Sequence, residues 1–422
     1  MSKLLKFASK AIGKDVEYKF VPAGAEEATW DLLEKSTPQF DKEGNLTKGP
    51  IPRSNRSNLA YILENDSRFE SLCYHDHADK MLYEGAPVED QIIENVGIFL
   101  ERIYHMKAQD KALKMALTRA AMNNIYDPIK DWLVALPAWD GESRLENIFD
   151  EIYKANYDPS FNDLVKEMSR KWLITFVARI FEPGCEVHSA LTLISTEKGV
   201  GKGLSLKALF GESWYSNSPL EIGTTRGYMA LHQSGVWCWE IAEMASLQGK
   251  TAELSKAFFT GAWDRYTANY GYFPKHRPRR TCFVLSSNNI KILSDGAERR
   301  FWPIIIQGGQ RVNIEIIKET RTQLFAEAKH RYEAGESWYL DPVQSKRLQE
   351  YQELFIIDDP WACKVKEAIL NSPIGASTSQ IMDKLELPIA QQHTGNSKRI
   401  AQICKELGFT QHRSKDGRTW KR

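Results

Sequence analysis

The feature that most constrains the fold is a short apolar segment that leads into a glycine-containing loop and then into a helical pattern. Residues 190–194 have the length and composition of a buried strand, and residues 204–210 have helical spacing. Two more strand candidates follow at 236–239 and 281–285, with helical or loop segments between them. Strands that alternate with helices favour a parallel sheet. We therefore expect an α/β core.

The remaining segments predict smaller domains around this core. Residues 1–57 are polar and rich in Gly and Pro turns, which is typical of an arm or linker. Residues 58–160 have helical apolar spacing and predict a mainly α-helical N-terminal domain, whereas the core is expected over 161–345. Three helical segments and a strand pair around Asp416-Gly417 predict a C-terminal winged helix over 360–422.

Composition excludes several classes of protein. Apolar residues make up 42% and charged residues 26%, as in globular proteins, and no apolar run is long enough to predict a transmembrane helix. The N-terminus lacks the features of a signal peptide, and the six cysteines are isolated, so we expect a reducing cytoplasm and no membrane partner. From Trp361 onward, eleven Lys and Arg face five Asp and Glu, a net charge of about +6 that favours nucleic-acid binding over a merely solvated basic face.

The loop after the first strand has the features of a phosphate-binding loop (P-loop). Its glycines allow a close approach of the backbone to phosphate, and Lys202 can reach the β and γ phosphates of a nucleotide. The match is imperfect, because Thr196 replaces the first glycine and Gly203 replaces the hydroxyl residue that binds Mg²⁺. An ordinary strand-to-helix turn is the alternative. The predicted ATP-binding residues are Lys198, Gly199, Val200, Gly201, Lys202, Gly203 and Leu204.

Polar residues after the later strands favour the phosphate-loop interpretation. Glu240 and Glu243 follow the second strand, where a carboxylate can hold Mg²⁺ and polarise water; Glu240 is the predicted metal ligand. Asn288 ends the third strand and can position water near the γ-phosphate. Arg299 or Arg300 can act as an arginine finger on a neighbouring subunit's nucleotide. With Gly at 203, magnesium must depend on the acidic pair and water, or on Ser205.

The order of these segments resembles the virulence-associated protein E family over residues 58–310. The closest likeness is Ser286-Ser287-Asn288 followed by Arg299-Arg300-Phe301-Trp302-Pro303. Further similar segments are Asn124-x-Tyr126-x-Pro128, Trp139-Asp140-Gly141, Glu240-x-x-Glu243, Lys256-Ala257-Phe258-Phe259, Asp264-Arg265-Tyr266, Tyr270-Gly271 and Arg279-Arg280.

This resemblance implies an AAA+-like superfamily 3 helicase from a phage or other mobile element. Such a motor is expected to form a ring-shaped homo-oligomer, here a hexamer. It would hydrolyse ATP with Mg²⁺ between subunits, translocate on single-stranded DNA and open forked DNA in the cytoplasm of a bacterial host. A separate primase or initiator is an expected partner. The resemblance assigns Lys202 to the phosphate loop, Glu240 and Glu243 to Walker B, Asn288 to sensor 1, and Arg299 or Arg300 to the finger.

Two basic segments are candidates for DNA contact. Cations and aromatic rings alternate between the second and third strands, which favours a hairpin that follows a DNA backbone over an exposed turn whose tyrosines belong partly to the core. The resemblance places this hairpin in a ring pore. The C-terminal domain would add a recognition helix and a wing, or it could dock a protein. The predicted DNA-binding residues are Arg265, Tyr270, Lys275, His276, Lys398, Arg399, Arg413, Lys415 and Arg418.

Two other functions remain open from the sequence. The degenerate phosphate loop is also compatible with an origin-binding initiator whose ATP site is weak or inactive, and a monomeric P-loop phosphotransferase would need no arginine finger. His75-Asp76-His77 has no third metal ligand at useful spacing, so the sequence predicts a solvated loop there.

Overall fold

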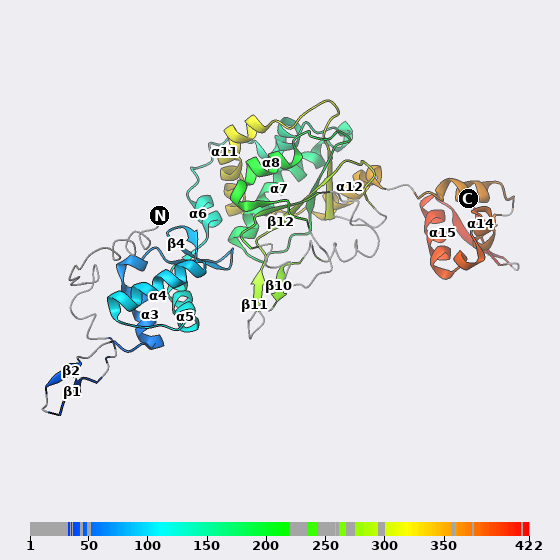
Figure 1. Cartoon of the computed structure of the whole chain (residues 1–422). Coiled ribbons are helices and arrows are strands. Elements are labelled where there is room, and N and C mark those ends of the chain that lie inside the picture. The colour runs from blue at the N-terminus through cyan, green and yellow to red at the C-terminus, as the bar shows by residue number, and fades with distance from the viewer. Residues whose placement is uncertain are drawn as a thin grey trace. The chain divides into compact units, whose positions relative to one another are not determined.

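The computed structural model divides into two compact units, residues 1–288 with 300–344 and residues 289–299 with 345–422 (Figure 1). The residues that it describes are 33, 35, 37–42, 45–48, 52–219, 234–242, 258, 261–266, 275–293, 300–356, 359–373, 375–414 and 417–421. Within these ranges, no helix is both long and apolar enough to span a bilayer.

The first unit begins with helices beside a small four-stranded sheet of order β5-β4-β3-β6. Leu59, Val96, Leu100 and Leu117 are buried in its core, at helical spacing on their elements. The elements are β1 (Gln39–Phe40), β2 (Leu46–Lys48), α3 (Arg56–Asn65), η1 (Ser67–Phe69), β3 (Cys73–His75), β4 (Lys80–Tyr83), β5 (Ala86–Pro87), α4 (Asp90–Tyr104), α5 (Asp110–Met122), β6 (Ile125–Tyr126) and α6 (Pro128–Val134).

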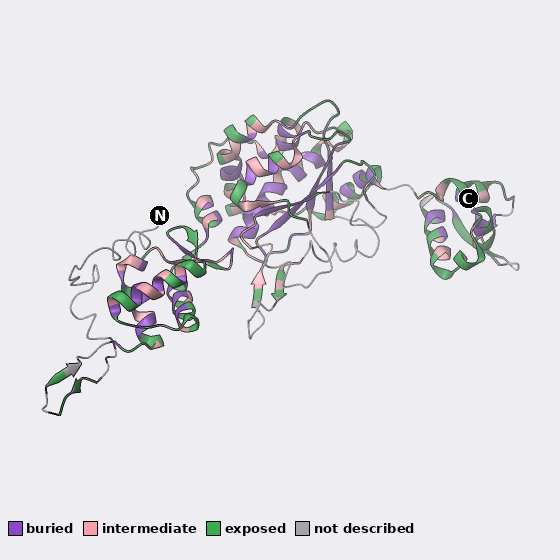
Figure 2. Ribbon diagram, viewed as in Figure 1, coloured by how far each residue is buried: buried purple, intermediate pink, exposed green. Residues whose placement is uncertain are grey.

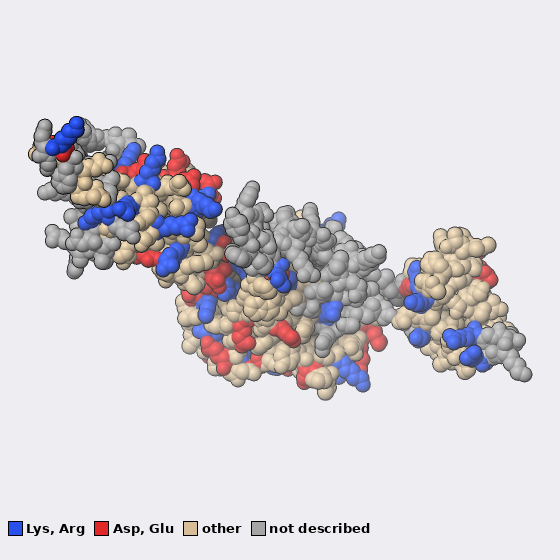
Figure 3. Space-filling model, turned by 90° about the horizontal axis from the view of Figure 1, so that it is seen from below, with Lys and Arg blue, Asp and Glu red and all other residues tan. Residues whose placement is uncertain are grey.

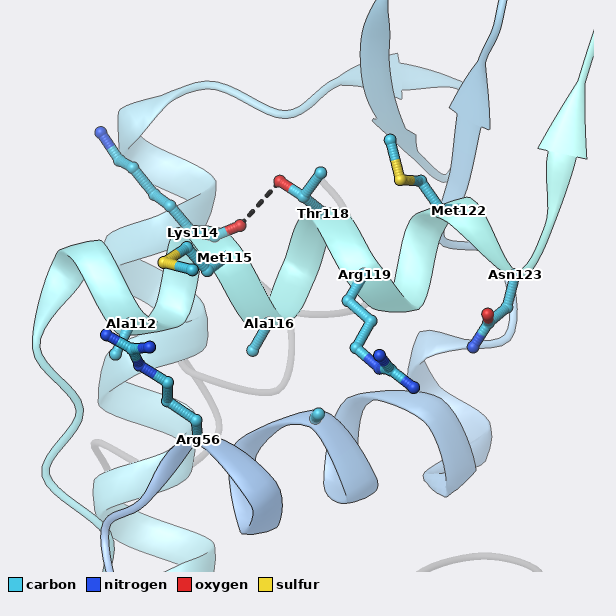
Figure 4. Close-up of a pocket in the computed structure, with 10 residues that line it drawn as sticks. Arg56, Ala112, Lys114, Met115, Ala116, Thr118, Arg119, Met122 and Asn123 are labelled. Atoms are coloured by element: carbon cyan, nitrogen blue, oxygen red, sulfur yellow. Dashed lines mark hydrogen bonds between the residues drawn. The ribbon is translucent and has the colours of Figure 1, made fainter. Parts of the chain in front are cut away.

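A groove of about 680 Å³ lies between α3 and α5 (Figure 4). Its floor is apolar, with Ala116 beside the half-exposed Met115 and Met122, and Arg56 and Arg119 stand at its edge. Arg119 pairs with Glu64, so part of this positive charge is already balanced within the domain. The groove shares no residue with the glycine loop of the α/β core.

The α/β core contains a fully parallel five-stranded sheet of order β13-β7-β12-β9-β8. The expected parallel α/β sheet is therefore confirmed. Figure 2 shows buried residues concentrated in these strands, as expected for a sheet with continuous apolar runs. The elements are η2 (Leu145–Asn147), η3 (Ile148–Ile152), η4 (Pro159–Phe161), α7 (Asn162–Phe181), β7 (Ala190–Ile194), α8 (Lys202–Phe210), η5 (Glu212–Trp214), β8 (Tyr215–Ser216), β9 (Cys238–Ala242), β12 (Cys282–Ser287), β13 (Phe301–Ile305) and α11 (Ile314–Glu333).

Trp237 is the centre of the packing between this sheet and its helices. Its side chain is fully buried, and its indole N–H donates to the Phe176 carbonyl of α7 at 3.0 Å. Phe210 of α8 and Phe325 of α11 contact the same ring, with centroids 5.3 and 4.9 Å away. One aromatic side chain thus joins three helices to the residue before β9, and its contact with α8 is at Phe210, the last residue of that helix.

Strand β13 of this unit was not expected from the sequence, whereas a hairpin between the second and third predicted strands was. The run from Phe301 was interpreted as a motif, whereas it forms β13, and Pro303 is tolerated because β13 is an edge strand of the sheet. The predicted DNA hairpin contains β10 (Trp263–Tyr266) paired antiparallel with β11 (Lys275–Pro278). Its intervening residues 267–274 lie outside the described residues.

In the described residues of the second unit, three helices and a three-stranded sheet of order β14-β16-β15 surround one core, and most of the preceding helix α12 belongs to the same unit. Ile381, Ile400 and Trp420 are buried there, and Ser377 forms a capping box with Gln380 at the start of α14. The elements, including the preceding α12, are α12 (Pro342–Gln352), η8 (Glu353–Phe355), α13 (Ala362–Leu370), β14 (Ala376–Ser377), α14 (Thr378–Lys384), η9 (Ile389–Gln391), α15 (Thr394–Glu406), β15 (Thr410–Ser414) and β16 (Gly417–Lys421).

A buried carboxylate connects α11 to the segment before the core. Glu327 has no exposed side-chain surface, and its oxygens accept hydrogen bonds from the Arg144 and Leu145 amides at 2.7 and 3.0 Å. Arg331 donates to the same carboxylate at 2.9 Å. These bonds satisfy both the charge and the backbone donors, so the three groups depend on each other.

We predict that Glu327→Ala lowers the free energy of unfolding by about 3–5 kcal/mol, because it leaves two amides without their acceptor and Arg331 with Glu336 as its remaining carboxylate partner. Glu333→Ala is the control. Its carboxylate is 57% exposed and 3.9 Å from Lys329, so it should cost less than about 1 kcal/mol. Urea unfolding followed by circular dichroism measures both. Equal losses in the two variants would contradict the role given to Glu327.

Candidate functional site

The strand order predicts a ligand-binding crevice at the carboxyl edge of the parallel sheet. The chain leaves β7 toward α8 and β8 on one side, and leaves β12 toward β13 on the other side of β7. Loops that diverge from adjacent parallel strands leave a crevice between them, the usual ligand position in open α/β sheets. The glycine loop after β7 and the end of β12 border this crevice.

The glycine loop adopts the backbone that its composition predicts. Gly199 and Gly201 have φ values of 75° and 101°, a region that other residues rarely adopt. Gly201 is the N-cap of α8 and has no side chain to accept hydrogen bonds from the first turn. Val200 is buried, and its carbonyl accepts from the Val312 amide at 2.9 Å, which anchors the loop. Lys198 and Leu204 are exposed on either side.

Lys202, the first residue of α8, connects this loop to β12. Its ammonium donates to the Ser287 carbonyl at 2.9 Å and to the Asn288 side-chain oxygen at 2.8 Å. Burial lowers the pKa of Lys202, and the nearby Glu240 carboxylate opposes this shift. The structure therefore brings Lys202 and Asn288, separated by 86 positions, into direct contact.

Glu240 lies in β9 and faces the start of α8. It is 5% exposed, and the Tyr215 hydroxyl of β8 donates a hydrogen bond to its Oε2. A Cβ built at Gly203 would lie 2.7 Å from this oxygen and 3.2 Å from the Tyr215 hydroxyl. Burial and the Glu240 carboxylate raise the pKa of Tyr215, so its hydroxyl stays protonated. Sequence reasoning missed Tyr215, because a two-residue strand has no periodic signal.

Ser205 does not reach this site, so its suggested role in magnesium binding is wrong. The residue is fully buried, and its hydroxyl lies 3.2 Å from the Tyr153 hydroxyl and 2.5 Å from the Lys202 carbonyl. The groups that remain at the crevice are an ammonium, a carboxylate, a phenol and an amide oxygen. This combination suits a phosphate chain together with a hard cation, since such cations prefer oxygen ligands.

The predicted arginine finger lies at the opposite edge of the sheet. Arg300 directly precedes β13, whose first residue Phe301 pairs with Ala190 and whose last residue Ile305 pairs with Ile194. A five-residue strand spans about 16 Å, so Arg300 is on the amino edge, away from Lys202 of the same chain. It lines a small cavity there with Arg179 and other residues. Arg299 and Glu243 lie outside the described residues.

The β10–β11 hairpin divides its cations between the surface and the interior. Arg265 is exposed and is paired across the hairpin with His276, whereas Tyr270 and the side chain of Lys275 lie outside the described residues. Arg279 is buried and forms an ion pair with Asp264 at 2.6 Å. This internal pair stabilises the base of the hairpin.

Arg277 and Arg280, at the same base, bind the loop after β3. Arg277 donates to the carbonyls of Asp76 and His77, and Arg280 pairs with the Asp76 carboxylate. His75 and His77 are 8% and 3% exposed, so the expectation of a solvated loop is wrong. The described residues contain no group of three or more His, Cys, Asp or Glu side chains that could hold a metal. These histidines are therefore part of a buried junction within the first unit.

The cations predicted in the second unit lie on α15 and on the β15–β16 hairpin. Lys398 is exposed, whereas Arg399 is held by Asp359 at 2.8 Å and stacks on Trp361. Arg413 and Arg418 are both exposed and are direct cross-strand partners. Lys415 lies outside the described residues. On the face seen in Figure 3, this unit (right) has more Lys and Arg than Asp and Glu.

Comparison with known proteins assigns the family. The family model for the virulence-associated protein E-like domain matches residues 133–356, more than half of the chain. The chain belongs to the virulence-associated protein E-like domain family. The matched segment contains the glycine loop, Glu240, Asn288 and Arg300. No curated protein matches the chain.

Solved structures give weaker likenesses. The apo structure of the NrS-1 C-terminal region (305-718) is 13% identical, with a TM-score of 0.41, over 80% of this chain and 85% of that chain. An A form apo structure of the same region is 12% identical, with a TM-score of 0.40, over 78% and 83%. With both TM-scores below 0.5, the assignment to the virulence-associated protein E-like family rests on the family model.

We predict that the stability of the chain falls as the pH drops below about 6.5, partly because of His77. Burial, with Arg280, Arg277 and His75 nearby, holds the pKa of His77 well below its ordinary value. The folded state keeps this ring neutral while the unfolded state takes up a proton, so the free energy of unfolding declines by up to about 1.4 kcal/mol per pH unit.

Unfolding of wild type and His77→Asn between pH 8 and 5 tests this. The variant should have a shallower decline below about pH 6.5, since Asn cannot take up the proton. His412→Asn, at an exposed position on β15, is the matched control and should keep the wild-type slope. If His77→Asn kept that slope as well, proton uptake by His77 would not contribute.

Proposed function

We propose that this chain is an ATP-dependent motor that translocates on single-stranded DNA and opens forked DNA during replication of a phage or another mobile element. The observation that carries this proposal is the meeting of Lys202, Asn288 and Glu240 at the carboxyl edge of the sheet. Three segments far apart in the sequence thereby place a phosphate-binding cation beside a carboxylate and an amide. Membership of the virulence-associated protein E-like family supports the proposal.

The residues at the crevice suit ATP and Mg²⁺. Lys202 and the amides of the loop and first turn of α8 would hold the phosphates, and Glu240 would hold the metal side of the site. When bound, Mg²⁺ neutralises charge that develops on the β and γ phosphates. Glu240 would also accept a proton from the attacking water, and Asn288 would orient that water once Lys202 turns toward phosphate.

The position of Arg300 favours a site shared between subunits. On the amino edge of the sheet, it is too far from its own Lys202 to contact the same nucleotide. In a ring-shaped homo-oligomer, proposed here as a hexamer, the amino edge of one subunit would face the crevice of the next. Arg300 or Arg299 would then stabilise phosphate charge in trans.

We predict that Lys202→Ala lowers ATP turnover by on the order of a hundredfold or more, because the transition state loses its main cationic contact. Lys207→Ala is the control, since Lys207 is on the same helix but pairs with Glu212. Turnover is measured with and without single-stranded DNA at several protein concentrations. If Lys202→Ala retained full turnover, the crevice would not be the ATP site.

The same assay distinguishes the motor from the two alternative functions, a monomeric phosphotransferase and an origin-binding initiator. A shared-site motor requires turnover per chain that rises with DNA and with protein concentration. A monomeric phosphotransferase would keep normal activity in the Arg299/Arg300 double variant without forming rings. If the wild-type chain hydrolysed no ATP under any condition, the preferred function would be an origin-binding initiator with an inactive ATP site.

The second unit is proposed to be a winged helix that binds DNA. Like charges directly opposite on paired strands destabilise a hairpin, yet Arg413 and Arg418 face each other on β15 and β16. A phosphate backbone would supply the compensating charge. This feature also favours the initiator alternative, in which this unit recognises duplex DNA at an origin.

We predict that the Arg413→Ala/Arg418→Ala chain binds DNA more weakly and with a lower salt dependence. Each lost phosphate contact should reduce the slope of log K against log salt by about one. The control is Lys364→Ala/Lys366→Ala, which removes the same charge from exposed positions of α13. Fluorescence anisotropy with labelled DNA at several salt concentrations measures both. The same slope in both double variants would argue against a specific contact by the hairpin.

A further inference from the structure

Position 203 is constrained by its neighbours in space as well as by its place in the phosphate loop. The common loop carries Ser or Thr after the lysine, and that hydroxyl binds Mg²⁺. Here a Cβ at Gly203 would be 2.7 Å from Glu240 Oε2, which is closer than ordinary carbon–oxygen contacts. The carboxylate already fills the space that a side chain at this position would need.

Tyr215 keeps the carboxylate in that space. Its hydroxyl donates to Glu240 Oε2, and Tyr215 itself is fixed by pairing with Cys238 in the adjacent strand. The same hydroxyl would lie 3.2 Å from the Cβ of residue 203. A serine oxygen is only one bond from its Cβ, so a serine hydroxyl at position 203 would lie in the neighbourhood of the phenol oxygen.

We propose that Tyr215 is a positioning residue that supplies, from β8, the hydroxyl missing at Gly203, so that Tyr215 and Glu240 together hold the magnesium side of the ATP site. This inference rests on the proposed ATP-binding function. The proton of the phenol is directed to Glu240, and its oxygen lone pairs are available to the metal or to a water bound to it. Glycine at 203 is therefore part of the arrangement, because it leaves room for both groups.

For Gly203→Ser, this geometry predicts the opposite of what the common loop sequence would suggest. Gly203→Ser restores the common loop sequence, but in the wild-type background its Cβ meets a carboxylate held in place by Tyr215. Without the phenol hydroxyl, the Glu240 side chain can turn aside and a serine hydroxyl can occupy the site. Gly203→Ser should therefore be harmful alone and helpful together with Tyr215→Phe.

Binding of the non-hydrolysable analogue AMP-PNP, by calorimetry with Mg²⁺ or with EDTA, tests this in the full chain. The readout is the ratio of the two dissociation constants, which isolates the metal-dependent part of binding. In Tyr215→Phe this ratio should fall about 10- to 100-fold, as for other groups that orient metal ligands. Gly203→Ser should also lower this ratio. The Gly203→Ser/Tyr215→Phe double variant should have a higher ratio than either single variant, so that the effects of the two changes are not additive.

Tyr332→Phe is the matched control. It removes another tyrosine–glutamate hydrogen bond, 2.7 Å to Glu182, between α11 and the end of α7. Its Mg²⁺ ratio should equal the wild-type ratio, and thermal unfolding of every variant identifies those that do not fold.

The possible results distinguish failure of the proposed role of Tyr215 from failure of the proposed ATP-binding function. If wild type binds AMP-PNP better with Mg²⁺ and Tyr215→Phe keeps that ratio, the role of Tyr215 is overturned and the ATP site stands. If the double variant showed the sum of the two single losses in the Mg²⁺ ratio, the proposal that the Tyr215 hydroxyl replaces a serine hydroxyl at position 203 would also be overturned. If wild type does not bind AMP-PNP at all, both the proposed function and this inference fail.

Discussion

The hydrogen bonds from Lys202 to the end of β12 are the interaction on which the site depends. They hold a half-buried ammonium at the carboxyl edge of the sheet and join the first residue of α8 to a strand 80 residues later in the chain. Burial of a cation is costly, and partial burial lowers the pKa of Lys202. Such a group is ready to exchange its two neutral acceptors for a phosphate, which carries full negative charge.

The corner formed by Gly203, Tyr215 and Glu240 is the other half of the site. Under the proposed function, this corner would let a degenerate phosphate loop bind Mg²⁺, because the hydroxyl missing from the loop has a phenol hydroxyl beside its position. Gly203 departs from the common loop sequence, and Tyr215 was not singled out from the sequence, yet both lie against the same Glu240 carboxylate. The close packing leaves no room for a side chain at position 203 while Glu240 keeps this conformation.

The central strand β12 also organises the hairpin beside it. Before β12, Arg279 pairs with Asp264 of the hairpin and Arg280 pairs with Asp76 near the small N-terminal sheet. At its end, Ser287 and Asn288 receive Lys202. The proposed DNA hairpin and the proposed ATP site are thus built on the two ends of one strand, with a junction of buried histidines beside the first end.

The sequence by itself determined the local elements and the type of fold. Apolar runs and helical spacing predicted β7 and α8 at nearly their observed bounds, because each of these elements buries the apolar residues that its own periodicity places together. It also predicted the glycine loop, whose positive φ values follow from Gly199 and Gly201. Only the tertiary structure decided which groups meet: Tyr215 with Glu240, Lys202 with Asn288, and Arg277 with the His77 carbonyl. These contacts depend on strand order and burial across long sequence separations, which local periodicity does not encode.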